Sequence, residues 1–185
     1  LVISYRNGYL IVATYEKDDH EYIEKASESA LKVSGLIEGK YRLGISEIKN
    51  DLGLLGRSID ESKYAYDFAA LYDMSQAKFS DMGIYQLLIP IVNDPWVYSF
   101  YKRIIDKLIN YDKDKGTDLL NTAIAYVESE GNIQTASEKL FQHANTIRYR
   151  IRKINEIIGP SQIKGMTYET LSIAVRLHLI NSKLF

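Results

Sequence analysis

Residues 143–156 combine side chains that can hydrogen-bond to the edges of nucleic-acid bases with cations that can bind phosphates. If this segment is helical, at about 100° per residue its polar side carries five residues, which are Asn145, Arg148, Tyr149, Arg152 and Glu156. Arginine can donate two hydrogen bonds to guanine, and asparagine can form two with adenine. The chemistry that this pattern predicts is recognition of double-stranded DNA.

These side chains are expected to divide the work between bases and phosphates. The first turns of a recognition helix approach the bases, so the predicted base contacts are Asn145, Thr146, Arg148 and Tyr149. Arg152 and Lys153 are predicted to hold phosphates. His143 lies just before the helix and either caps it or meets a phosphate. Arg150 projects closer to the apolar side, so both an ion pair within the protein and a DNA contact remain open.

The opposite side of the same segment is apolar. Its isoleucines follow the spacing i, i+4, i+7, i+11, which is one stripe of a helix, and they are Ile147, Ile151, Ile154 and Ile158. A short helix over 134–140 and a turn over 141–143 precede the long helix over 144–158, which is the anatomy of a helix-turn-helix. Ala136 is small where the two helices cross, and Leu140 joins the shared core. A purely structural helical bundle is the alternative interpretation.

The elements around this motif are also predicted to be helical. Asp94 before Pro95 marks the start of a helix that runs to about residue 110. Residues 111–116 are predicted to be a charged linker. Thr117 is expected to cap a helix that ends near Glu130, where Gly131 supplies the left-handed terminus. Thr167 is expected to cap a last helix that reaches about residue 182.

The first 80 residues have a mixed pattern. Residues 1–15 alternate like a β-hairpin, and Asn7-Gly8 suits a type I′ turn between its strands. A helix from Asp18 or Asp19 to about residue 35, a strand over 41–45, a helix to about residue 72 and a strand over 76–79 follow. The predicted order is ββαβαβ.

Two details refine this part of the prediction. Asn50 or Asp51 is expected to open the second helical region, and Ser58 with Glu61 fits a capping box for its main part. The fold class is α+β, with an N-terminal α/β domain over 1–82, connecting helices over 83–115 and an all-α helix-turn-helix domain over 116–185.

Composition narrows the classes of function. The chain has no cysteine, which excludes disulfides, thiol catalysis and thiolate metal sites. The net charge is −1, yet residues 139–164 carry six Lys or Arg and only one acid, Glu156. Three scattered histidines and an acidic cluster at Asp18, Asp19 and Glu21 give no metal site.

We expect a cytoplasmic protein that needs no cofactor and does not contact a membrane. Since it starts at Leu1, we interpret it as a fragment of a longer protein.

The run Asn145-Thr146-Ile147-Arg148-Tyr149-Arg150-Ile151, after Gly131-Asn132-Ile133, resembles the C-terminal helix-turn-helix of the PucR/CdaR family of bacterial regulators. Tyr111-Asp112 before Leu119-Leu120 fits the same family. The resemblance covers about residues 100–184. Ser137 departs from it, since the family usually has a second alanine there. The resemblance implies a transcription regulator that binds DNA as a dimer or larger assembly.

Residues 1–88 resemble the degenerate GGDEF-like domain that often precedes this motif. The resemblance rests on the run 41–46, on Ser58 and Glu61, and on the run 81–88. In active diguanylate cyclases, acids on a hairpin turn hold metal ions, whereas the corresponding turn here, residues 6–9, has no carboxylate. We therefore expect no enzyme activity.

The family resemblance also implies that an upstream domain senses a small-molecule effector. Two other functions stay open: a nucleotide-binding or cyclase-derived signalling module, and a helical protein-interaction module that does not bind DNA.

Overall fold

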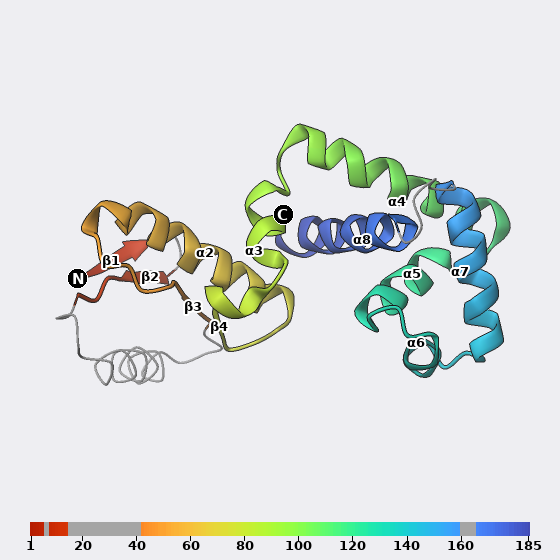
Figure 1. Ribbon diagram of the computed structural model, residues 1–185, viewed down its shortest axis with the longest axis horizontal. Coiled ribbons are helices and arrows are strands. Elements are labelled where there is room, and N and C mark those ends of the chain that lie inside the picture. Colours follow the sequence, from red (N-terminus) through yellow and green to blue (C-terminus); the bar gives the residue numbers. More distant parts are fainter. Residues whose placement is uncertain (6–7, 15–41, 160–165) are drawn as a thin grey trace. The chain divides into compact units, whose positions relative to one another are not determined.

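The computed structural model describes residues 1–5, 8–14, 42–159 and 166–185 (Figure 1). The chain divides into two compact units, residues 1–89 and residues 90–185. In the described residues, the first unit contains strands and helices and the second contains helices. An α+β composition with a helical C-terminal part is therefore confirmed.

The strands described in the first unit form two small sheets. β1 (Val2–Tyr5) pairs antiparallel with β2 (Gly8–Ile11), and Tyr5 lies opposite Gly8. Gly8 is thus a strand residue, so its predicted place in the turn is wrong, and Asn7 lies outside the described residues. β3 (Leu43–Ile45) pairs in parallel with β4 (Gln76–Lys78). The helix predicted to follow Asp18 or Asp19 also lies outside the described residues.

A long helix packs directly on β3. α2 (Leu55–Leu71) follows the short 3-10 helix η1 (Leu52–Leu54), whose first turn is capped by the Asp51 carboxylate. The prediction that Asp51 opens this helical region is confirmed. A Cβ atom on Gly44 would lie 2.0 Å from the backbone oxygen of Ser62. Only glycine therefore allows α2 to approach the strand this closely.

The predicted capping box at Ser58 and Glu61 is wrong. Helix α2 starts upstream at Leu55, so both residues lie within it. Glu61 is buried instead, and its carboxylate accepts a hydrogen bond from the Glu47 backbone N–H and pairs with Lys49 and Arg57. A buried carboxylate requires such partners. Through its contacts with Glu47 and Lys49, Glu61 holds residues 47–49 against α2.

Two short helical elements follow β4, and the boundary between the two units falls within the second of them, after Ile89. These are η2 (Phe79–Met82) and α3 (Tyr85–Ile91), and α3 confirms the helix expected in the apolar segment after Gly83. The rings of Phe68, Tyr72 and Tyr85 meet between α2 and α3, with Phe68 4.9 Å from Tyr72 and 5.2 Å from Tyr85 between centroids.

The second unit begins with α4 (Pro95–Lys115). The Asp94 carboxylate accepts hydrogen bonds from the backbone N–H groups of Trp96 and Val97, as its place before Pro95 predicts. The helix continues through the segment predicted to be a linker, and that prediction is wrong. The positive charges of Lys113 and Lys115 stabilise the last turn of α4, because the C-terminal end of the helix dipole is negative. Gly116, with φ of 62°, then ends the helix in the left-handed conformation.

Four helices complete this unit, and they are α5 (Leu119–Glu128), α6 (Ile133–Lys139), α7 (Ala144–Ile158) and α8 (Met166–Leu184). Helix α4 packs on α8, α5 and α7, and α5 also packs on α6, α7 and α8 (Figure 1). The fully buried residues of this core include Ile105, Leu108, Leu119, Ile147, Ile154, Leu171, Leu177 and Ile180. Helix α8 already includes Thr167, so the predicted cap at that residue is wrong.

Candidate nucleic-acid interface

Helices α6 and α7 form the helix-turn-helix that the sequence predicts. The Asn132 side chain caps α6 by accepting hydrogen bonds from the backbone N–H groups of Gln134 and Thr135. Ala136 is fully buried, as expected for the small residue predicted where the two helices cross. The Ser137 hydroxyl is buried and donates to the Gln134 carbonyl oxygen at 2.7 Å. The hydroxyl is therefore accommodated inside α6.

The turn between the helices is set by its own backbone hydrogen bonds. Phe141 has φ of 52°, and the next N–H, of Gln142, donates to the Ser137 carbonyl oxygen at 3.0 Å. The His143 Nδ1 atom then accepts a hydrogen bond from the Asn145 backbone N–H at 3.2 Å. Of the two roles left open for His143, capping is the one that the structure contains.

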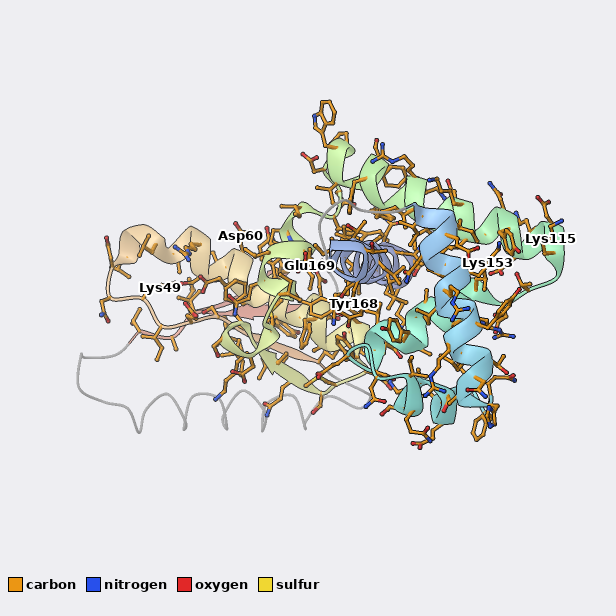
Figure 2. All side chains as sticks on the ribbon, turned by 45° about the vertical axis from the view of Figure 1, so that its right-hand side comes forward. Lys49, Asp60, Lys115, Lys153, Tyr168 and Glu169 are labelled. Atoms are coloured by element: carbon orange, nitrogen blue, oxygen red, sulfur yellow. The ribbon has the colours of Figure 1, made fainter. Side chains whose placement is uncertain are left out.

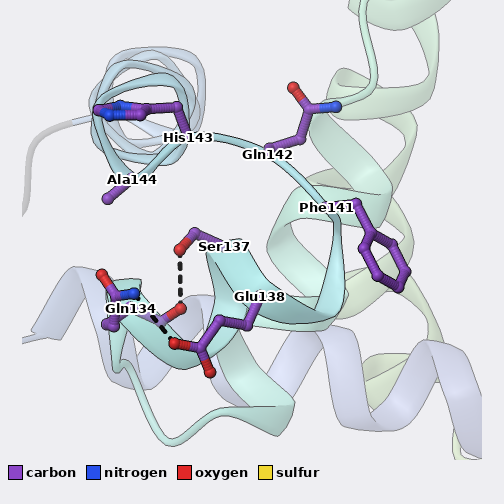
Figure 3. A pocket seen from close by; sticks show the side chains of 7 residues that line it. All are labelled: Gln134, Ser137, Glu138, Phe141, Gln142, His143 and Ala144. Carbon is purple, nitrogen blue, oxygen red and sulfur yellow. Dashed lines mark hydrogen bonds between the residues drawn. The ribbon is translucent and has the colours of Figure 1, made fainter.

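Next to this turn lies a shallow hollow between α6 and the start of α7 (Figure 3). Gln134, Ser137 and Glu138 line it from α6, and His143 and Ala144 line it from the other side. Phe141 and Gln142 of the turn complete its lining (Figure 3), and the Phe141 ring is 94% exposed. The Gln134 amide donates to the Glu138 carboxylate at 2.9 Å. The Ser137 hydroxyl also donates to the Gln134 carbonyl oxygen, so the polar side chains of α6 that line the hollow are paired within α6.

One side of α7 is anchored in the core. Ile147, Ile151 and Ile154 are buried, while Ile158 and Leu140 are half-buried. The apolar stripe is thus confirmed, with its two outermost members at the edge of the core.

The other side of α7 is open to solvent. Asn145, Arg148, Tyr149 and Arg152 are exposed and Thr146 is half-buried. Arg148 Nη1 donates to Asn145 Oδ1 at 2.7 Å, so two of the predicted base-contacting side chains are already in contact. The described residues leave this polar face uncovered.

Lys153 lies at the edge of the exposed face. Its Nζ atom is 2.9 Å from a Glu156 carboxylate oxygen and 5.7 Å from the centre of the Tyr111 ring on α4. The hydrogen bond to Glu156 raises the pKa of the Lys153 ammonium. Figure 2 shows this lysine on the outer side of α7, near the end of α4 that carries Lys115.

Arg150 points into the protein. Its Nη1 atom donates to the buried Thr122 hydroxyl at 3.1 Å and is 3.6 Å from an Asp118 carboxylate oxygen. Of the two roles left open for Arg150, the intramolecular ion pair is the one that the structure contains.

The start of α5 is capped from outside that helix. Asp112, near the end of α4, accepts hydrogen bonds from the backbone N–H groups of Leu119 and Leu120 at 2.7 and 3.0 Å and from the Thr117 hydroxyl at 2.6 Å. The prediction of Thr117 as the cap is therefore wrong. Sequence reasoning missed this role because it depends on a contact between two helices.

The comparison with protein families agrees with this geometry. Residues 119–177 match the PucR C-terminal helix-turn-helix domain. The matched PucR-type segment runs from α5 into α8 and contains the whole exposed face of α7. No solved structure matches the chain.

Among similar proteins, the DNA-binding transcriptional activator AdeR of Bacillus subtilis is 26% identical over 170 residues, which cover 85% of this chain and 39% of AdeR. The proline-responsive transcriptional activator PutR of the same bacterium is 28% identical over 118 residues, covering 62% of this chain and 29% of PutR. Its purine catabolism regulatory protein is 29% identical over 83 residues, covering 45% of this chain and 15% of that protein. The chain thus spans well under half the length of these relatives. Together with the PucR-type match, they support a DNA-binding transcription regulator.

Two further features, a metal-ligand cluster and a membrane-spanning helix, are absent from the described residues. Within residues 1–5, 8–14, 42–159 and 166–185, no group of three or more His, Cys, Asp or Glu is placed to hold a metal ion. No helix in this part of the chain is long and apolar enough to cross a membrane.

Proposed function

We propose that this chain is the DNA-binding part of a cytoplasmic transcription regulator and that α7 enters the major groove. The observation that carries the proposal is the uncovered polar face of α7, with Asn145, Arg148, Tyr149 and Arg152 exposed. It lies within the segment that matches the PucR C-terminal helix-turn-helix domain.

The roles of the side chains follow from their positions on α7. Asn145, Thr146, Arg148 and Tyr149 belong to its first turns and are the proposed base contacts. Arg152 and Lys153 lie further along and are the proposed phosphate contacts, and His143 meets a phosphate from the turn while it caps the helix. The contact of Lys153 with Tyr111 and Glu156 holds its charge at the rim of this face.

The wider organisation is proposed on the same basis. A single helix-turn-helix reads only a short half-site, so we propose a homodimer or larger assembly on DNA. We propose that residues 1–82 are a degenerate GGDEF-like domain without enzyme activity, joined by residues 83–115 to the DNA-binding residues 116–185. We propose that an upstream domain senses a small-molecule effector; among the relatives, PutR is named as proline-responsive.

The salt dependence of DNA binding tests this function. Each phosphate neutralised by a Lys or Arg contributes about −0.9 to the slope of log affinity against log salt. We expect the affinity for duplex DNA to fall with salt with a slope that corresponds to several phosphate contacts. We also expect selection from a random duplex pool to enrich a particular sequence. Binding that is independent of salt, or a pool that stays random after repeated selection, would contradict the proposal.

A further inference from the structure

We propose that Arg150 is a positioning residue, which fixes the rotation of α7 about its own axis so that Arg148 and Asn145 face the bases. This inference rests on the proposed function and deepens it. It assigns to Arg150 a role in sequence specificity that needs no contact with DNA.

The contacts of Arg150 lie on one neighbouring helix. Its guanidinium donates to the hydroxyl of Thr122 and approaches the carboxylate of Asp118, both at the start of α5. Thr122 is fully buried, and its hydroxyl in turn donates to the Asp118 carbonyl oxygen at 2.6 Å. The Arg150 side chain is 22% exposed, so its head group is held in a defined place.

The end of α5 that receives Arg150 is itself fixed. Asp112 of α4 accepts hydrogen bonds from the backbone N–H groups of Leu119 and Leu120. A continuous set of directional contacts therefore runs from α4 through the first turn of α5 to α7. Charge-assisted hydrogen bonds of this kind carry strong geometric preferences.

The apolar stripe of α7 does not by itself fix the rotation of this helix about its axis, so a directional contact is needed. Ile147, Ile151 and Ile154 hold α7 against the core, but aliphatic contacts are non-directional and tolerate small rotations. Arg150 and Arg148 are separated by roughly 160° around the helix, since each residue turns it by about 100°. Any rotation that withdraws Arg150 from Thr122 therefore also turns Arg148 relative to a groove.

The substitution Arg150→Met tests this role, because methionine keeps an unbranched apolar stem and loses the donors. The 185-residue wild-type chain first selects a duplex from a random pool. Wild type and variant are then titrated with that duplex and with a scrambled one over a range of salt concentrations. We expect the ratio of the two affinities to fall about tenfold, the scale of one lost base contact. The salt slope should stay unchanged, since no phosphate contact is removed.

Controls separate positioning from a loss of folding. Arg103→Met is the matched variant, because Arg103 is an exposed arginine on α4, and it should leave the affinity ratio unchanged. If Arg150→Met does not fold, Thr122→Val removes the same hydrogen bond from the other side and should lower the ratio. Thr122→Ser restores the hydroxyl and should restore the ratio.

Each remaining outcome has a definite meaning. A salt slope that becomes shallower by about 0.9 in Arg150→Met would make Arg150 a phosphate contact and overturn the inference. An unchanged affinity ratio in folded variants would overturn it as well. A wild-type chain that enriches no duplex would overturn the proposed function, and this inference with it.

Discussion

At the scale of single residues, Arg148 and Lys153 differ in what they can contribute to DNA binding. Arg148 lies on the exposed face beside Asn145, whereas Lys153 lies at its edge against Tyr111. A base contact adds affinity only for the correct sequence, whereas a phosphate contact adds affinity for every sequence. The two side chains should therefore be separable by mutation.

We expect Arg148→Ala to weaken binding to the selected duplex by about 1–3 kcal/mol and binding to random DNA by less. Lys153→Ala should weaken binding to both duplexes about equally. Fluorescence anisotropy titrations with the two duplexes measure both effects. Equal losses on every sequence for both variants would show that Arg148 does not read a base.

Asp112 also acts at the residue scale, through stability. Its carboxylate accepts two backbone N–H groups at the start of α5, so Asp112→Ala should lower the free energy of unfolding by about 1–2 kcal/mol, as loss of a helix cap does. Urea unfolding measures the loss. Asp114→Ala is the control, because Asp114 is exposed and lies two residues away. Equal stability of the two variants would rule out the capping role.

At the scale of elements, the position of α2 on β3 depends on one glycine. A Cβ atom at Gly44 would meet the backbone of Ser62 at 2.0 Å and of Tyr66 at 2.3 Å. Backbone atoms cannot yield as the end of a flexible side chain can, so the helix itself would have to move. The strand and helix thus pack closely through the absence of a side chain.

Gly44→Ala should therefore destabilise the first unit by about 3 kcal/mol or more, which is a severe case of overpacking. Gly56→Ala is the matched variant within α2, where a Cβ meets nothing within 4 Å. It should stabilise the chain by about 0.5 kcal/mol, because alanine loses less backbone entropy on folding. Thermal unfolding followed by circular dichroism compares the two, and a tolerated Gly44→Ala would mean that α2 does not pack as described.

At the scale of the whole molecule, the chain consists of two compact units. The second unit has its own buried core, which α4, α5, α7 and α8 share. The proposed DNA contacts all lie on α7 or the turn before it. Residues 90–185 therefore contain both the proposed interface and the helices that hold it.

We expect residues 90–185, produced alone, to fold cooperatively and to bind duplex DNA with the salt slope of the 185-residue chain. Equal slopes would mean that the same phosphates are contacted. Residues 1–89 serve as the comparison and should not bind. A folded 90–185 fragment with a much shallower slope would place part of the DNA interface in the first unit.

Much of the site could be read from the sequence because it depends on local pattern. The period of the isoleucines in α7 defines the buried stripe and hence the exposed polar face. Asp94 before Pro95 and the small Ala136 are signals of the same local kind. The helix-turn-helix and the side chains on its open face were therefore predictable without a structure.

The tertiary structure alone decided the contacts between elements. Arg150 donates to the Thr122 hydroxyl, and Asp112 caps the start of α5. Glu61 is a buried partner of Lys49 and not part of a capping box. In each case the partner lies on a different element, so the pairing depends on how the elements pack and not on the pattern within one helix or strand. Such pairings follow from which buried groups must be satisfied once the elements have packed.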